Sequence, residues 1–263
     1  MIKSTINSTL GLATGFLLTI ILHELAHYIM SVILGYEATL YHNRVFSETN
    51  GIKNHEIMIA GIAPLFSLVQ GVLAYQASKK MESSSISLFV LWFGITGIIT
   101  FFGYLMIAPL IPIGDTGKVF SLLNIPWVIQ VITSIIAIVI VTIILMKSAK
   151  QFERYAIEDF GSVEVNRKKW SVSLILMPLL LSIVLVTLFQ FPIPHILSIL
   201  ATICIPFSIM AVFGAFIGSK DKLRKDPQGN SINQDISIPL ICLFIFVGIL
   251  NRILVNGISL VNN

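Results

Sequence analysis

The sequence "ILHELAHYIM", residues 21–30, places two histidines and a glutamate inside an otherwise apolar run. The run extends on both sides, with "STLGLATGFLLT" before this sequence and "SVILG" after it. An ionisable side chain at bilayer depth costs roughly 2.5–3.5 kcal/mol on insertion scales. His23, Glu24 and His27 therefore need an interaction that offsets this cost.

The composition indicates a polytopic membrane protein. Of the 263 residues 56% are hydrophobic and only 11% are charged, whereas soluble domains carry about 25% charged residues. Cys204 and Cys242 both lie in apolar runs and form no Cys-x-x-Cys pair, so we expect neither a disulfide framework nor a cysteine-based zinc site. The net charge of +4 is modest and its basic residues lie between apolar runs, which gives no support for nucleic-acid binding.

The apolar runs predict an all-α polytopic fold with about seven transmembrane helices. A helix needs about 20 apolar residues to cross a bilayer. The first run is too long for a signal peptide, and we interpret it as a retained span. The predicted spans are 9–34, 57–78, 86–111, 125–146, 172–191, 196–217 and 236–257.

The connector between the first two predicted spans, residues 35–56, has a different composition. It contains "EATLYHNRVF", which is rich in β-branched and aromatic residues, and Asn50–Gly51, which is a hairpin-turn signal. We expect a small β-hairpin within 37–58, and an ordinary solvated loop is the alternative.

The basic residues predict the orientation. With seven spans, thirteen of the 17 Lys and Arg residues fall on the side of the N-terminus. Because cytoplasmic loops carry an excess of Lys and Arg, this distribution predicts a cytoplasmic N-terminus. The other side has Arg44, Lys53, Lys118 and Arg252.

The helical spacing of His23, Glu24 and His27 in the first span indicates a metal site. His23 and His27 are four residues apart, so their rings project from one helix face and can share a metal. Glu24 lies on an adjacent part of that face, where a carboxylate can take a proton from a metal-bound water. The pattern is H-E-x-x-H, which indicates a zinc site with Glu24 as the base.

A catalytic zinc site needs a third protein ligand. Asp115 follows a span interrupted by Pro109, Pro112 and Gly114, which can turn a carboxylate back into the bundle. It can equally cap a short helix that begins near Thr116. The other candidate ligands are His42, Glu48, His55 and Glu56.

Three segments resemble the site-2 protease family of intramembrane zinc metallopeptidases: "HELAH", "AGIAPLFSLVQG" and "PLIPIGDTGK". The resemblance covers roughly residues 9–123 and implies a metalloprotease-like core of three helices in 1–123, with further helices in 124–263. It implies that Asp115 is the third zinc ligand and that Lys118 occupies a position where the family has a basic residue. It also implies that 37–46 pairs with an unwound substrate.

The resemblance has limits. Thr116 separates Asp115 from Gly117, where the family has glycine directly after the aspartate, and the asparagine that usually precedes the motif is absent from 101–108. The family also places its metal nearer the cytosolic face, whereas the charge count directs the first helix outward.

These patterns predict an intramembrane zinc metalloprotease of the cell membrane that hydrolyses a peptide bond in a membrane-embedded protein or leader peptide. The alternative is a non-enzymatic polytopic protein, such as a transporter subunit or an immunity-type protein, with a degenerate metalloprotease core. A membrane zinc hydrolase acting on a lipid or prenylated peptide is a third, weaker hypothesis. An intact Glu24 favours an enzyme, because a structural metal site does not need a base.

Overall fold

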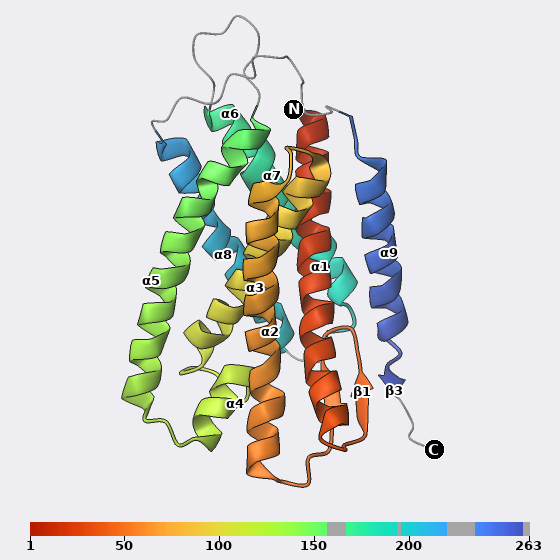
Figure 1. Ribbon diagram of the computed structural model, residues 1–263, viewed down its shortest axis with the longest axis vertical. Helices are drawn as coiled ribbons and strands as arrows, with labels where there is room; N and C mark the ends of the chain where they lie inside the picture. Colours follow the sequence, from red (N-terminus) through yellow and green to blue (C-terminus); the bar gives the residue numbers. More distant parts are fainter. Residues whose placement is uncertain (157–166, 194–195, 220–234, 260–263) are drawn as a thin grey trace, which may run out of the picture.

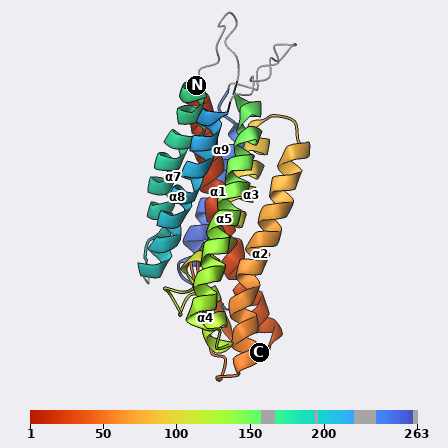
Figure 2. The same cartoon turned by 90° about the vertical axis from the view of Figure 1, so that its left-hand side faces the viewer.

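The computed structural model describes residues 1–156, 167–193, 196–219 and 235–259, which form an elongated bundle of helices with a small sheet near one end (Figure 1). Figure 2 shows α5 and α2 on the outside of the bundle, with α1 behind them. The helices are α1 (Ile2–Ile33), α2 (Lys53–Lys80), α3 (Ser85–Ile107), α4 (Asp115–Leu122), α5 (Trp127–Phe152), α6 (Arg167–Ser171), α7 (Met177–Gln190), α8 (Ile196–Gly218) and α9 (Ile238–Leu254). A 3-10 turn (Glu153–Tyr155) follows α5, and a π-helical turn (Val172–Leu176) joins α6 to α7.

Each of the seven apolar segments expected from the sequence is helical. Within the described residues, five helices are long and apolar enough to cross a membrane: Ile2–Ile33, Lys53–Lys80, Ser85–Ile107, Trp127–Tyr155 and Arg167–Gln190. Phe207–Gly218 and Ile238–Leu254 are apolar but shorter. The chain is therefore a helical membrane protein with five candidate spans, and the expected number of seven is not confirmed.

Helix α1 begins seven residues before the predicted span, because its first polar side chains bond to the rest of the bundle. The Asn7 side chain donates to the Asp235 carbonyl oxygen at 3.0 Å and accepts from the Ser237 amide at 3.0 Å. Ser8 donates to the Leu174 carbonyl oxygen at 2.7 Å and accepts from the Trp92 indole at 2.9 Å. Buried polar groups with such partners do not incur the full desolvation cost that hydropathy assumes.

Helices α2 and α3 lie close together because glycines line their contact. A Cβ atom added at Gly71 would lie 2.5 Å from the Ile98 amide nitrogen, and one at Gly94 would lie 2.5 Å from the Tyr75 amide nitrogen. Gly15 of α1 approaches α3 in the same way, with its Cβ position 3.0 Å from the Phe93 amide nitrogen. Small residues allow such close approach between membrane helices, and here they fix α1, α2 and α3 as one unit.

The sheet confirms the expected hairpin and adds a third strand. Strands β1 (Ala38–Leu40) and β2 (Val45–Ser47) pair antiparallel, and β3 (Ile258–Ser259) pairs with the other edge of β1. The prediction that Asn50–Gly51 forms the hairpin turn is wrong. Both residues have positive φ angles, 50° and 72°, but they form the turn that leads from β2 into α2.

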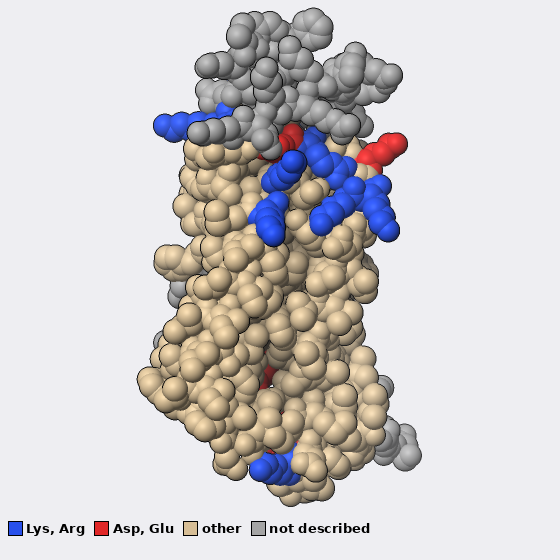
Figure 3. Space-filling model, turned by 60° about the vertical axis from the view of Figure 1, so that its left-hand side comes forward, with Lys and Arg blue, Asp and Glu red and all other residues tan. Residues whose placement is uncertain are grey.

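The two ends of the bundle differ in charge. We call the end with Met1, α6 and the first turn of α9 the amino end, and the end with the sheet and α4 the sheet end. On the face shown in Figure 3, Lys and Arg side chains gather at the amino end, and a broad belt of uncharged side chains separates them from the sheet end.

Candidate metal centre

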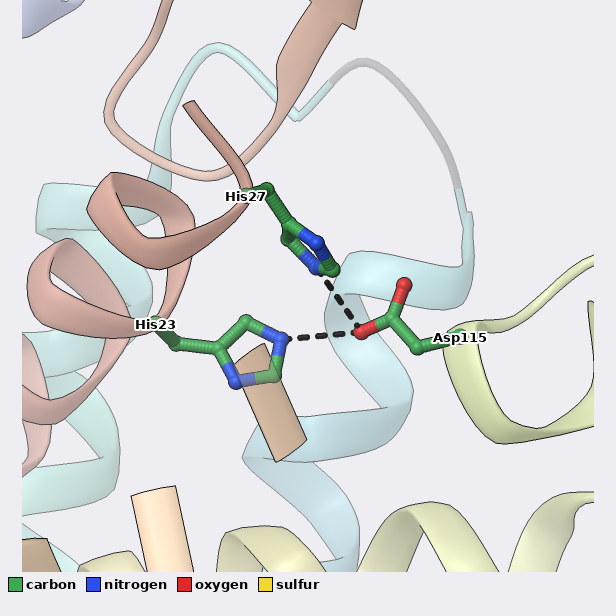
Figure 4. A group of neighbouring side chains, drawn as sticks. All are labelled: His23, His27 and Asp115. Carbon is green, nitrogen blue, oxygen red and sulfur yellow. Dashed lines mark hydrogen bonds and ion pairs between the residues drawn. The ribbon is translucent and has the colours of Figure 1, made fainter. Parts of the chain in front are cut away.

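Three side chains from two distant parts of the sequence meet near the sheet end (Figure 4). The Nε2 atom of His23 lies 2.9 Å from the Oδ2 atom of Asp115, and the Nε2 atom of His27 lies 3.2 Å from the same oxygen. The two imidazole rings are 5.0 Å apart and nearly perpendicular, at 86°. The structure thus brings together the three residues that the sequence and the resemblance proposed as metal ligands.

The spacing of these groups fits a small metal ion. One ligand atom from each residue lies within 4.8 Å of the others. With bond lengths of 2.0–2.1 Å, neighbouring ligands of a tetrahedral zinc lie about 3.3 Å apart, close to the two distances above. Burial opposes ionisation of Asp115, but the neighbouring His27 and His23 outweigh it and hold the pKa of this carboxyl below its usual range. An ionised carboxylate and two imidazoles can bind a divalent metal.

The Nδ1 atoms of both rings are already engaged, which leaves the Nε2 atoms for a metal. The Nδ1 atom of His23 lies 3.0 Å from the buried Ser67 hydroxyl oxygen of α2. The Nδ1 atom of His27 lies 2.6 Å from the Ile59 carbonyl oxygen, to which it donates. Such a partner on the second nitrogen fixes the tautomer and ring orientation of a metal-binding histidine. Ser67 was not singled out from the sequence, although it lies within "AGIAPLFSLVQG".

Asp115 is placed by the short helix α4. Its helix begins after Gly114, which occupies the cap position, and no side-chain cap bond is made there. The alternative that Asp115 caps this helix is therefore wrong, because its carboxylate turns to His23 and His27 instead. Two residues later, a Cβ atom on Gly117 would lie 2.0 Å from the Ile111 carbonyl oxygen. Only glycine lets the preceding "IPIG" segment fold back against α4 at this distance.

Glu24 lies beside the three candidate ligands on α1. It is 8% exposed, and it interacts electrostatically with His23, His27 and Asp115. Among the described residues, no hydrogen bond or ion pair engages its carboxylate. The group is therefore available to accept a proton from a molecule bound at the centre.

Tyr104 of α3 forms one wall of the centre. Its ring stacks on His23, with centroids 5.0 Å apart and planes within 5° of parallel. It also lies near Asp115 and Glu24. This tyrosine was not expected from the sequence, because its spacing from the aspartate matches no motif and only the fold brings them together.

The other candidate ligands have different partners. His55 bonds with the Tyr36 hydroxyl at 2.6 Å, and Glu56 accepts from Thr49 at 2.8 Å and pairs with Lys118 at 3.3 Å. His42 bonds to a backbone carbonyl oxygen, and Glu48 is exposed. Across the described ranges, His23, His27 and Asp115 form the only group of this kind.

Comparisons of the chain with protein-family models, with curated proteins and with solved structures find no match. The class of protein that the fold and the centre define is therefore a helical membrane protein with a group able to bind a metal ion.

Proposed function

We propose that this protein is an intramembrane zinc metalloprotease that cleaves a membrane-embedded protein or peptide. The observation that carries the proposal is the convergence of the Nε2 atoms of His23 and His27 on the Asp115 carboxylate, with Glu24 unengaged beside them. Two histidines and a carboxylate with an adjacent glutamate form the ligand set and base of a hydrolytic zinc site.

The residues of the chain supply binding and proton transfer. His23, His27 and Asp115 would hold zinc, which when bound acts as a Lewis acid and lowers the pKa of a coordinated water to about 7. Glu24 accepts a proton from the water that attacks the scissile carbonyl carbon, and it delivers that proton to the departing amide nitrogen. The Ile59 carbonyl oxygen, which can only accept, keeps a proton on the Nδ1 atom of His27, and Ser67 orients the His23 ring.

The burial of the centre supports a choice of substrate class. His23 is 2% exposed and Glu24 8%, so the helices around the centre enclose it. Such a centre accepts a narrow extended segment rather than a folded domain. A transmembrane segment or leader peptide held by the bilayer is the substrate class, and the resemblance to site-2 proteases supports the same choice.

Metal analysis of the purified protein tests the proposal. We expect about one zinc per chain in the wild type and loss of zinc in His27→Ala, since two ligands hold the ion poorly. Absence of stoichiometric zinc from a folded wild-type protein contradicts the proposal. Zinc with no cleavage dependent on Glu24 instead favours the non-enzymatic alternative, a membrane protein that keeps a degenerate protease core.

A further inference from the structure

We propose that the amino end of the bundle contacts the anionic cytoplasmic leaflet and that the metal centre lies in the outer half of the bilayer. The orientation stands on the charge distribution alone. The orientation also has a consequence for substrates, which rests on the proposed function. If the protein is a protease, the bond that it cleaves lies near the outer leaflet. This orientation is opposite to the one that the resemblance to site-2 proteases implies.

The described residues divide unequally between the two ends. The amino end has nine basic residues and three acidic ones, Glu82, Glu153 and Asp235, whereas the rest of the described chain, toward the sheet end, has four basic and five acidic residues. On the face in Figure 3, basic side chains crowd the amino end. The nine basic residues are Lys3, Lys79, Lys80, Lys147, Lys150, Arg154, Arg167, Lys168 and Lys169.

Three of the basic residues at the sheet end are used within the fold. Lys118 pairs with Glu56 at 3.3 Å, and the Arg44 guanidinium lies 4.7 Å from the centre of the Tyr41 ring. Arg252 donates to the Phe189 carbonyl oxygen. Basic residues of the amino end are also engaged, since Lys3 pairs with Asp235 and Arg167 with Glu153, so the two ends differ in the number of basic residues rather than in their pairing.

This distribution of basic residues favours one orientation in the membrane. Lys and Arg side chains near an anionic leaflet are attracted to it, and an excess of these residues is retained on the cytoplasmic side during insertion. Among the described residues the amino end has five more basic residues than the sheet end, nine against four. The amino end is therefore the cytoplasmic end.

Helix α1 then fixes the depth of the centre. His23 lies ten residues and His27 six residues before Ile33, where α1 ends. At 1.5 Å per residue these histidines are about 15 and 9 Å from the sheet end of the helix. His23 is about 32 Å from Ile2 on the same scale. A bilayer core of about 30 Å centred on this helix places both histidines in the outer half.

Cysteine labelling tests the orientation. With Cys204→Ser and Cys242→Ser as background, Glu48→Cys places a thiol at the sheet end and Glu82→Cys places one at the amino end. Both glutamates are exposed, and both replacements remove one negative charge, so each is the matched control of the other. In spheroplasts, a membrane-impermeant maleimide should label Glu48→Cys and leave Glu82→Cys unlabelled until the membrane is permeabilised.

The result that overturns the proposal is labelling of Glu82→Cys in intact spheroplasts, alone or together with Glu48→Cys. Lack of labelling at both positions before permeabilisation, with labelling of both after it, overturns it as well. The readout needs neither zinc nor activity. Loss of the proposed protease function therefore leaves this result unaffected, and an inverted orientation leaves the zinc analysis unaffected.

Discussion

Two clusters with a buried histidine lie toward the sheet end, and they use the imidazole ring in opposite ways. In the metal centre, the Nδ1 atoms of His23 and His27 are engaged, and both Nε2 atoms point to Asp115. In the second cluster, the Nε2 atom of His42 donates to the Gln190 carbonyl oxygen at 3.0 Å. There the Nδ1 atom of His42 has no partner among the described residues.

The comparison shows that burial alone does not identify a metal-binding histidine. His23 and His42 are similarly buried, at 2% and 3% exposure. They differ in their second ring nitrogen. At His23 the Nε2 atom lies 2.9 Å from the Asp115 carboxylate, with the His27 ring beside it. At His42 the Nδ1 atom has no hydrogen-bond partner among the described residues. The convergence of two imidazole nitrogens on one carboxylate oxygen is the property that distinguishes this group.

The sharpest test of this distinction is Asp115→Asn. An amide has nearly the same shape as a carboxylate, but it is neutral and binds zinc more weakly, so we expect zinc and proteolysis to be lost together. Metal analysis and a cleavage assay on the same preparation measure this. Full zinc occupancy with normal cleavage would mean that Asp115 is not a ligand, and the two clusters would then differ less than the geometry indicates.

Glu24→Gln separates proton transfer from metal binding. The replacement keeps the size of the side chain and removes the proton acceptor, so turnover should fall by at least the ~10²-fold typical of a general base. Zinc content should remain that of the wild type, because Glu24 is not among the three ligands. A variant that loses zinc in proportion to activity would assign Glu24 to metal binding instead.

Ser67→Ala tests whether the hydroxyl partner of the His23 Nδ1 atom contributes to zinc affinity. Without the hydroxyl group at 3.0 Å, the His23 ring is less restricted, and zinc affinity should fall by about 10–100-fold. Competition with a zinc chelator measures this. Ser182→Ala is the control, since Ser182 is also a buried serine but bonds to the Thr9 carbonyl oxygen. Equal effects of the two variants would rule out a specific role for Ser67.

His42→Gln should have the smallest effect on the centre and leave zinc affinity unchanged. We expect this substitution to change the pH dependence of the stability of the protein instead. Burial lowers the pKa of His42, and Arg252 and Arg44 act in the same direction against the opposing bond to Gln190. Because the folded pKa lies below the unfolded value of about 6.5, this contribution to stability is fully present above that value and declines as the pH falls below it.

Thermal unfolding at several pH values measures this contribution. Between pH 7.5 and 5.5 the midpoint of the wild type should fall more than that of His42→Gln, whose amide does not titrate. Parallel curves for the two proteins would show that His42 does not contribute to the pH dependence.

The sequence predicts the candidate ligands and base better than the residues that hold them in position. His23, Glu24 and His27 are local, because four-residue spacing on one helix already places the two rings together. Asp115 lies 92 positions from His23, and only the family resemblance favoured it over a helix cap. Ser67 and Tyr104 reach the centre through the packing of α2 and α3, which no local pattern records.

The fold shows the same division. Hydropathy located the long apolar helices but not the short helices α4 and α6. It also misplaced the start of α1, because hydropathy cannot recognise the hydrogen bonds of Asn7 and Ser8 to distant backbone. Composition predicted the hairpin of β1 and β2, whereas β3 is too short for any strand signal. Gly257, with a φ angle of 78°, lets the chain approach Tyr41 and Thr39 at that point.

The third strand has a consequence for the order in which the protein is made. Leu40 of β1 pairs with Ile258 of β3, and a ribosome adding 5–20 residues per second needs roughly 10–45 s to synthesise the chain between them. During that interval β1 has only β2 beside it, although α1 with its histidines left the ribosome first. The sheet next to α1 is thus completed only after the chain between β1 and β3 has been made, and a chain interrupted before β3 has His23 and His27 in place without the third strand.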